Sequence, residues 1–205
     1  MGIRIYGGVA GSRAFRNIWM LEELGLPYEN VPVHFGSDET RTPAYLALNP
    51  NGRVPTLVDG DIVLWESIAI NLYLARRYDG GLQPKSPAGD ASVLKWSVWA
   101  VAEIDAPHDA AMRVGSTISA ADLRRAFHIL DDNLKGREYL VDDRFTVADL
   151  NVASIVARPT LPLLISNEFP EIERWRGACL SRRACIRAFE VVTTEHPKTK
   201  EAGND

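Results

Sequence analysis

Residues 49–67 decide the fold, and they read Asn49-Pro50-Asn51-Gly52-Arg53-Val54-Pro55-Thr56-Leu57-Val58, then a turn at Asp59-Gly60-Asp61, then Ile62-Val63-Leu64-Trp65-Glu66-Ser67. The pattern predicts a loop, a short strand entered at the Val54-Pro55 bond, a tight hairpin, a second strand, and a helix that begins at Glu66-Ser67. Proline has no N–H to donate, so it suits the entry or the edge of a strand.

The Val54-Pro55 bond also bears on function. X-Pro bonds in tight turns are sometimes cis, and in that form the main-chain N–H and C=O of Val54 would turn outward, unpaired. A short extended peptide can add to such an edge through main-chain hydrogen bonds. Glu66-Ser67 would then hold the charged end of the same ligand. The stretch therefore predicts a peptide-binding site.

The composition indicates an ordinary globular protein and excludes several classes of partner. The chain has 205 residues, of which 46% are hydrophobic and 24% charged, with a net charge of −4. The negative net charge argues against a basic surface that binds nucleic acid. No apolar run approaches the roughly 20 residues that a membrane span needs. We expect no secretory signal, because Ile3-Arg4-Ile5-Tyr6 follows the first two residues directly. Cys179 and Cys185 are expected to be free thiols in a reducing cytoplasm.

Hydrophobic periodicity predicts two domains of different class. The N-terminal part has the order β-α-β followed by β-β-α, a thioredoxin-like arrangement, with these strands and helices: strands Ile3–Tyr6, Tyr28–Val33, Thr56–Val58 and Ile62–Leu64; helices Ala14–Leu24 and Ser67–Tyr78. The remainder is predicted to be all helical, with helices Ala88–Met112, Ser119–Leu134, Thr146–Leu161, Glu171–Leu180 and Ala184–Thr193. We expect domains at 1–80 and 88–205, joined by a linker at 81–87.

The order of these motifs resembles the glutathione site of cytosolic glutathione transferases. The resemblance rests on Asn-Pro-x-Gly-Arg-Val-Pro-Thr-Leu, the hairpin, and Glu-Ser-x-Ala-Ile within residues 49–70, with Ile3–Gly7 and Ser12–Arg16 upstream. Downstream, Phe145–Leu150 is similar to the Ser/Thr-x-x-Asp box of the family's second domain. The resemblance covers Met1 to about Glu195 and implies a bacterial, serine-type or atypical member. It also implies glutathione as co-substrate, a small hydrophobic electrophile and a homodimer.

A transferase of this family must present the sulfur of glutathione as thiolate. The resemblance makes Ser12 the catalytic residue, in the turn between the first strand and the first helix. Its hydroxyl would donate to the sulfur, and a helix N-terminus lowers a thiol pKa. An alternative is that Ser12 only caps the helix. The commonest serine pattern has its hydroxyl one position earlier, at Gly11, so Arg13 or the main-chain amides of 12–14 stay open as the activating group.

The resemblance also assigns the residues that clamp glutathione. Ser67 would bind the γ-glutamyl carboxylate and Glu66 the ammonium group, while Val54 supplies main-chain N–H and C=O to the cysteinyl unit. Arg53 and the pair Thr40-Arg41 are candidates for the glycine carboxylate. A residue of the partner subunit often completes this site in the family. Glu103 and Asp105 are the candidates for that role.

The helical domain is expected to hold the electrophile. Thr146 and Asp149 form a capping box, which is a structural feature. Candidates for lining the electrophile pocket are Trp96, Trp99, Met112 and Arg113. No metal site is expected, because the histidines show no cluster.

Three functions remain open at this level. The first is conjugation of glutathione to an electrophile. The second is glutathione-dependent peroxide reduction or dehalogenation, which uses the same thiolate. The third is a regulatory protein that binds glutathione without turnover.

Overall fold

A four-stranded sheet forms the N-terminal part of the computed structural model, which describes residues 2–116, 120–158, 161 and 168–194. The strands are β1 Ile3–Tyr6, β2 Tyr28–Val31, β3 Thr56–Asp59 and β4 Ile62–Trp65. They lie in the order β2-β1-β3-β4, with β1 parallel to β2 and antiparallel to β3, and β3 antiparallel to β4. The predicted thioredoxin-like arrangement is confirmed, and β2, which precedes Pro32, is an edge strand.

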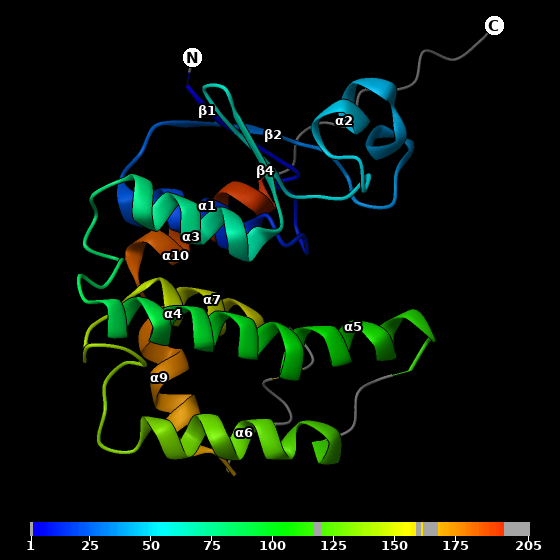
Figure 1. The fold of residues 1–205 in the computed structure, drawn as a ribbon. Helices are drawn as coiled ribbons and strands as arrows, with labels where there is room; N and C mark the ends of the chain where they lie inside the picture. The colour runs from blue at the N-terminus through cyan, green and yellow to red at the C-terminus, as the bar shows by residue number, and fades with distance from the viewer. Residues whose placement is uncertain (1, 117–119, 159–160, 162–167, 195–205) are drawn as a thin grey trace, which may run out of the picture.

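Three helices accompany the sheet: α1 Phe15–Leu24, α2 Pro43–Leu48 and α3 Ser67–Arg77. Helix α1 ends at Gly25, which has the left-handed φ of 62° that favours glycine at a helix C-cap. Helices α1 and α3 lie between the sheet and the helices of the C-terminal part (Figure 1). This central position gives α1 contacts with both parts of the molecule.

The C-terminal part is helical in its described residues, as predicted. Its helices are α4 Pro87–Ala100, α5 Ala106–Arg113, α6 Ala120–Leu134, α7 Val147–Val156, α9 Pro170–Leu180 and α10 Arg183–Thr193. The single helix expected over Ala88–Met112 is interrupted by a π-helical turn at Val101–Asp105. Such turns are rare and widen the helix locally. Helix α7 ends at Val156, five residues earlier than expected at Leu161.

The predicted capping box is present at the start of α7. The Oγ1 atom of Thr146 accepts a hydrogen bond from the N–H of Ala148, and Asp149 accepts one from the N–H of Thr146 at 2.9 Å. The other carboxylate oxygen of Asp149 accepts from the N–H of Leu140 and the indole of Trp175, each at 2.9 Å. Asp149 therefore joins three segments around a helix whose ten residues are all buried.

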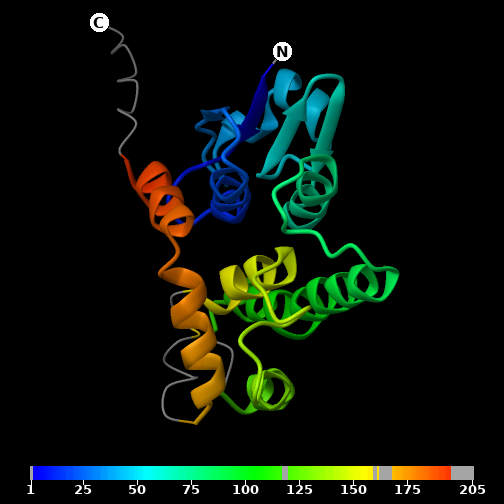
Figure 2. The same ribbon diagram turned by 90° about the vertical axis from the view of Figure 1, so that its left-hand side faces the viewer.

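Helix α10 returns to the N-terminal part and packs along α1 (Figure 2). Glu23 of α1 accepts two hydrogen bonds from Arg182, at 2.6 and 2.8 Å, and Glu22 accepts one from Arg187 at 2.6 Å. One continuous apolar core includes Ile5 of the sheet, Trp19 of α1 and Leu150 of α7. In the described part of the chain, no helix has the length and apolar character needed to cross a membrane.

Candidate functional site

The register of the strands brings three predicted site segments to one end of the sheet. Tyr6, at the end of β1, pairs with Thr56, at the start of β3, and Thr56 pairs with Trp65, at the end of β4. The loop that leaves β1, the loop that enters β3, and the Glu66-Ser67 pair that follows β4 must therefore lie side by side. The sequence segments 7–12, 53–55 and 66–67 form one candidate site.

The loop that enters β3 presents an unpaired main chain. The Val54-Pro55 bond is cis. Within the described residues, neither the N–H nor the C=O of Val54 makes a hydrogen bond. Gly7 packs closely against this residue, because a Cβ atom at Gly7 would lie 2.4 Å from the Cβ of Val54. The site thus offers one main-chain donor and one acceptor, as an extended peptide ligand requires.

Glu66 and Ser67 lie at the first turn of α3 in different environments. Glu66 is exposed and has a φ of 71°, an uncommon value for a residue other than glycine, Asn or Asp. Ser67 is buried, and its hydroxyl accepts a hydrogen bond from Arg16 at 3.3 Å while its carbonyl accepts one from Asn17 at 2.8 Å. Helix α1 therefore fixes the start of α3.

Ser12 is buried and its hydroxyl has two main-chain partners. The hydroxyl donates to the carbonyl oxygen of Gly7 and accepts from the N–H of Ala14 at 3.1 Å. The N–H of Ser12 donates to the carbonyl of Val9 at 3.1 Å. Of the amides at 12–14, only that of Arg13 makes no hydrogen bond to another described residue. The turn thus has one main-chain donor available, and the hydroxyl of Ser12 can donate to a ligand only by leaving the carbonyl of Gly7.

The three candidates for the glycine carboxylate differ in position. Thr40 is buried, and its hydroxyl donates to the carbonyl of Ser37 at 3.0 Å. Arg41 and Arg53 are both exposed. A Cβ atom at Gly52 would lie 3.0 Å from a guanidinium nitrogen of Arg41, so this cation lies beside the loop that carries Arg53.

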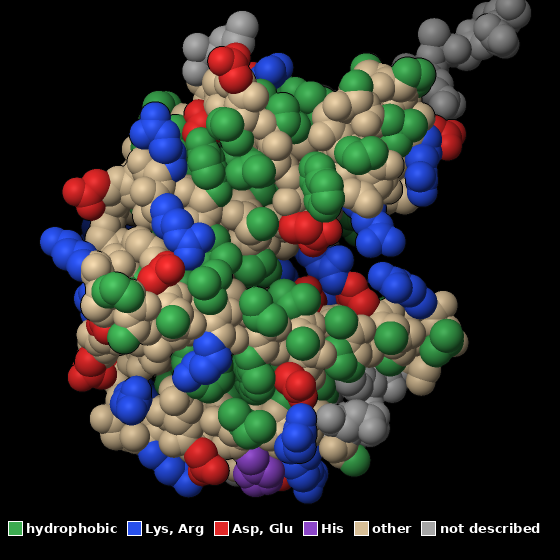
Figure 3. All heavy atoms as spheres, viewed as in Figure 1, with side chains coloured by type: hydrophobic (Ala, Val, Ile, Leu, Met, Phe, Trp, Pro, Cys, Tyr) green, Lys and Arg blue, Asp and Glu red, His purple; other side chains and the backbone are tan. Residues whose placement is uncertain are grey.

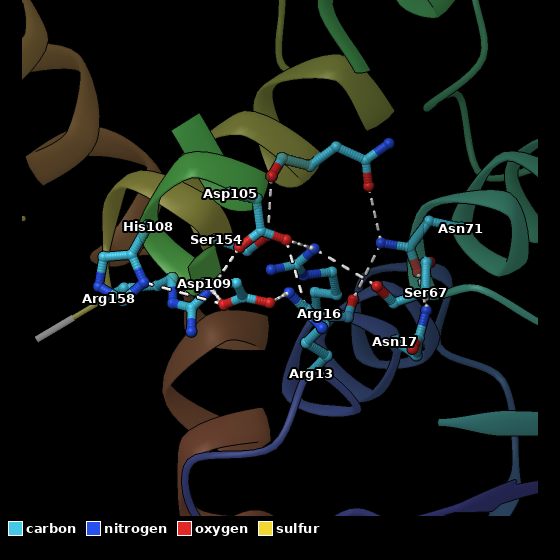
Figure 4. A network of polar contacts seen from close by, with 11 residues as sticks. Arg13, Arg16, Asn17, Ser67, Asn71, Asp105, His108, Asp109, Ser154 and Arg158 are labelled. Atoms are coloured by element: carbon cyan, nitrogen blue, oxygen red, sulfur yellow. Dashed lines mark hydrogen bonds and ion pairs between the residues drawn. The ribbon is translucent and has the colours of Figure 1, made fainter. Parts of the chain in front are cut away.

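A cluster of ion pairs lies behind the candidate site, where α1 meets the helical part (Figure 4). The buried carboxylate of Asp105 lies 3.3 Å from Nε of Arg13 and 3.6 Å from Nη1 of Arg16, and it also pairs with Arg158. Asp109 pairs with Arg13 and lies 2.7 Å from Nη1 of Arg158. We call these five residues the arginine–aspartate cluster.

The electrostatics of the cluster follow from burial and from its partners. Burial by itself would raise the pKa of Asp105, but the guanidiniums of Arg16, Arg13 and Arg158 together hold it below its ordinary value. Burial lowers the pKa of Arg16 to about 10, against the attraction of Asp105. Both groups are therefore charged at neutral pH. Arg16 also donates a hydrogen bond to Ser67, which connects the cluster to the start of α3.

Sequence reasoning missed this cluster. The sequence made Asp105 and Glu103 candidates for completing the site of a partner subunit. In the structure Asp105 is buried and paired within its own chain, and Glu103 pairs with Arg125 at 2.9 Å. The four-residue spacing of Asp105 and Asp109, which puts both carboxylates on one helix face, is the signal that was available.

Buried amides form a second connection between the two parts. Asn17 donates to Asn71 at 2.7 Å, Asn71 to Asn151 at 2.9 Å, and Asn151 to the hydroxyl of Ser97 at 3.0 Å. This chain of hydrogen bonds joins α1, α3, α7 and α4 in a region without solvent. Among the described residues Oδ1 of Asn17 has no partner, but the other amide contacts are made, and a buried network of this kind specifies one arrangement of the helices.

A cavity of about 510 Å³ opens beside Ser12. It lies between the start of α1, the end of α7 and helix α10, and Phe15, Arg158 and Phe189 belong to its lining. Its size suits a small-molecule ligand. The four residues expected to line an electrophile pocket are absent from this lining: Trp96, Trp99, Met112 and Arg113. Trp96 belongs to the core, with Trp99 packed edge-on against it at 5.1 Å between ring centroids.

The fold and this site define a class of protein, in which a thioredoxin-like domain with a cis-proline loop is combined with a helical domain. Two family models match the chain: "Glutathione S-transferase, N-terminal domain" over residues 1–76 and "Glutathione S-transferase, C-terminal domain" over residues 114–183. Among the described residues, no group of three His, Cys, Asp or Glu side chains is arranged to hold a metal ion.

Known relatives agree with these matches. The chain is 32% identical to glutathione S-transferase 1 of Schizosaccharomyces pombe, over 88% of this chain and 92% of the relative. It is 31% identical to glutathione S-transferase 3 of Zea mays, over 98% and 99% respectively. The crystal structure of the theta class glutathione S-transferase from Xanthomonas axonopodis pv. citri with glutathione bound superposes with a TM-score of 0.75, at 29% identity, covering 94% of this chain and 99% of that one. This chain belongs to the glutathione S-transferase family, as the sequence motifs predicted.

Proposed function

We propose that the protein conjugates glutathione to a small electrophile, with the peptide bound across the three segments that meet at one end of the sheet. The observation that carries the proposal is the unpaired main chain of Val54 between the Ser12 turn and the Glu66-Ser67 pair. A tripeptide in this position pairs its cysteinyl unit with Val54 and points its sulfur toward the turn at 11–13. The proposal includes a glutathione-binding domain at 1–80, a linker at 81–87 and an electrophile-binding domain at 88–205. It is supported by the end of α3 at Arg77 and the start of α4 at Pro87.

The two ends of glutathione meet groups of matching charge. The γ-glutamyl carboxylate accepts from the hydroxyl and N–H of Ser67 at the N-terminus of α3, and Glu66 accepts from the ammonium group. The glycine carboxylate meets Arg53 and Arg41, which are exposed beside the Val54 loop. Thr40 contributes to binding of the glycine carboxylate only indirectly, because its hydroxyl donates to the carbonyl of Ser37 within its own loop.

The reaction needs a donor that stabilises the thiolate. Ser12 is our candidate catalytic residue, and its hydroxyl must turn from the carbonyl of Gly7 to the sulfur. The free N–H of Arg13 is a second donor in the same turn. The thiolate then forms a carbon–sulfur bond to the electrophile, the leaving group departs with its electron pair, and the thiol proton passes to solvent.

Replacement of Ser12 by alanine is expected to raise the thiol pKa of bound glutathione by about one to two units, because a hydrogen bond to a charged group contributes about 1.5–3 kcal/mol. The measurement is the thiolate absorbance of the complex as a function of pH. Ser181→Ala is the matched control, because Ser181 is exposed and its hydroxyl donates only to the carbonyl of Ala178.

Each outcome of this titration decides between functions. A lowered thiol pKa that Ser12→Ala restores toward the free value supports the transferase with Ser12 as donor. A lowered pKa in both proteins keeps the enzyme and assigns activation to the Arg13 amide. If glutathione binds with its pKa unmoved in both, the protein is a regulatory binder and the proposed reaction is wrong.

The proposal includes a homodimer in the cytoplasm that detoxifies electrophiles. Hydrophobic side chains are exposed on the face shown in Figure 3. Large apolar side chains are exposed on β4, on α4 and at the start of the π-helical turn: Ile62, Val63, Trp65, Leu94, Val98 and Val101. Apolar patches of this kind mark interaction surfaces. Cys179 and Cys185 are free, which agrees with a reducing compartment.

Val98→Glu is expected to convert the dimer to a monomer, because Val98 is 63% exposed, with the exposed Leu94 and Val101 about one helical turn away on either side, and a buried charge opposes association. Sedimentation velocity measures the change. Val114→Glu is the control, since Val114 is also exposed but follows α5. Equal sedimentation of wild type and both variants would contradict a dimer through this face.

A further inference from the structure

The cavity beside Ser12 has an uneven distribution of charge. The charged side chains in its described lining are all arginines: Arg13, Arg16 and Arg158. Their partners Asp105 and Asp109 are absent from that lining, so the carboxylates contact the guanidiniums on the side away from the cavity. A ligand in the cavity therefore meets guanidiniums rather than carboxylates.

The arginine–aspartate cluster does not neutralise its own charge. Three guanidiniums face two carboxylates, which leaves one positive charge in excess. The adjacent His108 does not offset it, since it carries no negative charge in either protonation state. The excess positive charge lies at the arginine-lined end of the cavity, where it attracts an anion.

Two of the arginines have donors to spare. Arg158 uses Nη1 for both carboxylates, and its Nε and Nη2 make no hydrogen bond to another described residue. Arg13 uses Nε and Nη2, which leaves Nη1. Their side chains are 26% and 38% exposed, so a ligand can reach them. Guanidinium N–H groups in a fixed fork match the geometry of a carboxylate.

Most of the remaining lining is apolar, and it lies close to the proposed thiolate. Phe15 of α1 and Ile186, Phe189 and Val192 of α10 belong to the lining, as does Ser12. Phe189 is 61% exposed and Ile186 49%, so these side chains are available to cover a ring. The cavity thus combines an apolar body, a cationic end and access to the activating turn.

We infer that the electrophile of this protein carries a carboxylate beside an apolar, ring-sized body, with the carboxylate bound by Arg158 and Arg13. The inference rests on the proposed transferase function and narrows its substrate class from small hydrophobic electrophiles to apolar acids. In the reaction, the carbon–sulfur bond forms at the uncharged end of the electrophile, next to Ser12, and the leaving group departs there. The carboxylate takes no part in bond making and only orients the substrate.

The test compares two electrophiles that differ only at the acid. They are 4-(chloromethyl)benzoate and its methyl ester, in which the thiolate displaces chloride from the same carbon. The value of kcat/KM for each is divided by its uncatalysed rate constant with glutathione, which removes the electronic effect of the ester. We expect the corrected rate for the acid to exceed that for the ester by about tenfold or more, because the ester loses a hydrogen bond between two charged groups. Arg158→Gln should abolish most of this preference.

Controls separate this inference from a loss of folding. Arg125→Gln removes an exposed arginine of α6 that lies outside the cavity lining, and it should retain the full preference. Thermal unfolding of Arg158→Gln is measured alongside, because this residue pairs with Asp105 and Asp109. Arg158→Lys keeps the charge and should restore part of the preference.

A binding measurement decides the case in which neither electrophile reacts. Calorimetric titration with 2-naphthoate and with 2-naphthamide needs no turnover. Tighter binding of the acid, weakened in Arg158→Gln, keeps the assignment of the cavity even where the transferase proposal fails. Equal binding of the two compounds, or equal corrected rates for acid and ester, overturns it. So does an Arg158→Gln variant that weakens glutathione binding while the acid-to-ester ratio stays constant, because the arginines then serve glutathione.

Discussion

Replacing Asp105 by asparagine is expected to lower the free energy of unfolding by about 3–5 kcal/mol, the usual cost of breaking a buried ion pair by removing one partner. Asp105 is buried, and so is its partner Arg16. Asparagine would leave three guanidiniums around the single carboxylate of Asp109, with repulsion between them. Urea denaturation followed by tryptophan fluorescence measures the change.

Glu103→Gln is the matched control for this variant, two residues away in the same π-helical turn. Glu103 pairs with Arg125, whose side chain is 76% exposed, and exposed pairs contribute about 0–1 kcal/mol. A loss of stability in Asp105→Asn no larger than in Glu103→Gln would show that the arginine–aspartate cluster does not stabilise the contact between α1 and the helical part.

The pH dependence gives a second readout of the same cluster. The folded pKa of Asp105 is below its ordinary value, and so is that of Asp109. Their contribution is therefore fully present above the unfolded pKa of about 3.9 and is lost as the pH falls through the folded values. Asp105→Asn should lose less stability than wild type between neutral pH and that acid range. Parallel curves for the two proteins would contradict the linkage.

Most of the fold was predictable because its signals are local. The strand Ile3–Tyr6 and the hairpin around Asp59-Gly60 are set by short apolar runs with turn residues between them, and the structure forms them at the predicted places. The start of α3 at Ser67 was also predictable, because Glu66-Ser67 follows the hairpin directly. Neighbouring strands then bring these contiguous motifs together without further information.

The cluster and the cavity were not predictable in the same way, because their partners are distant in the sequence. Arg13 is 92 residues from Asp105, and Arg158 is 53 residues from it. Which charges meet depends on how α7 packs on α1 and on the π-helical turn, which changes the direction of Asp105 relative to a regular helix. The cavity also depends on α10 returning to α1, and no local pattern indicates that contact.

Replacing Asp149 by alanine is expected to lower the free energy of unfolding by about 4 kcal/mol, because each buried donor left unpaired costs about 1–3 kcal/mol and such losses are not fully additive. Four donors would lose their acceptor: the main-chain N–H groups of Leu140 and Thr146, the hydroxyl of Thr146, and the indole of Trp175. Urea denaturation followed by tryptophan fluorescence measures the loss.

Asp149→Asn is the graded control, because its single carbonyl oxygen can still accept from two of these donors, so its loss should lie between those of wild type and Asp149→Ala. Asp132→Ala removes an exposed carboxylate from α6 and should leave the urea midpoint unchanged. Helix α7 also carries Asn151, which binds Asn71 at 2.9 Å. Loss of the cap should therefore loosen the contact of α7 with α3, and glutathione should bind more weakly. If Asp149→Ala unfolds at the wild-type urea concentration, the four donors find other acceptors and the capping box does not hold α7 in place.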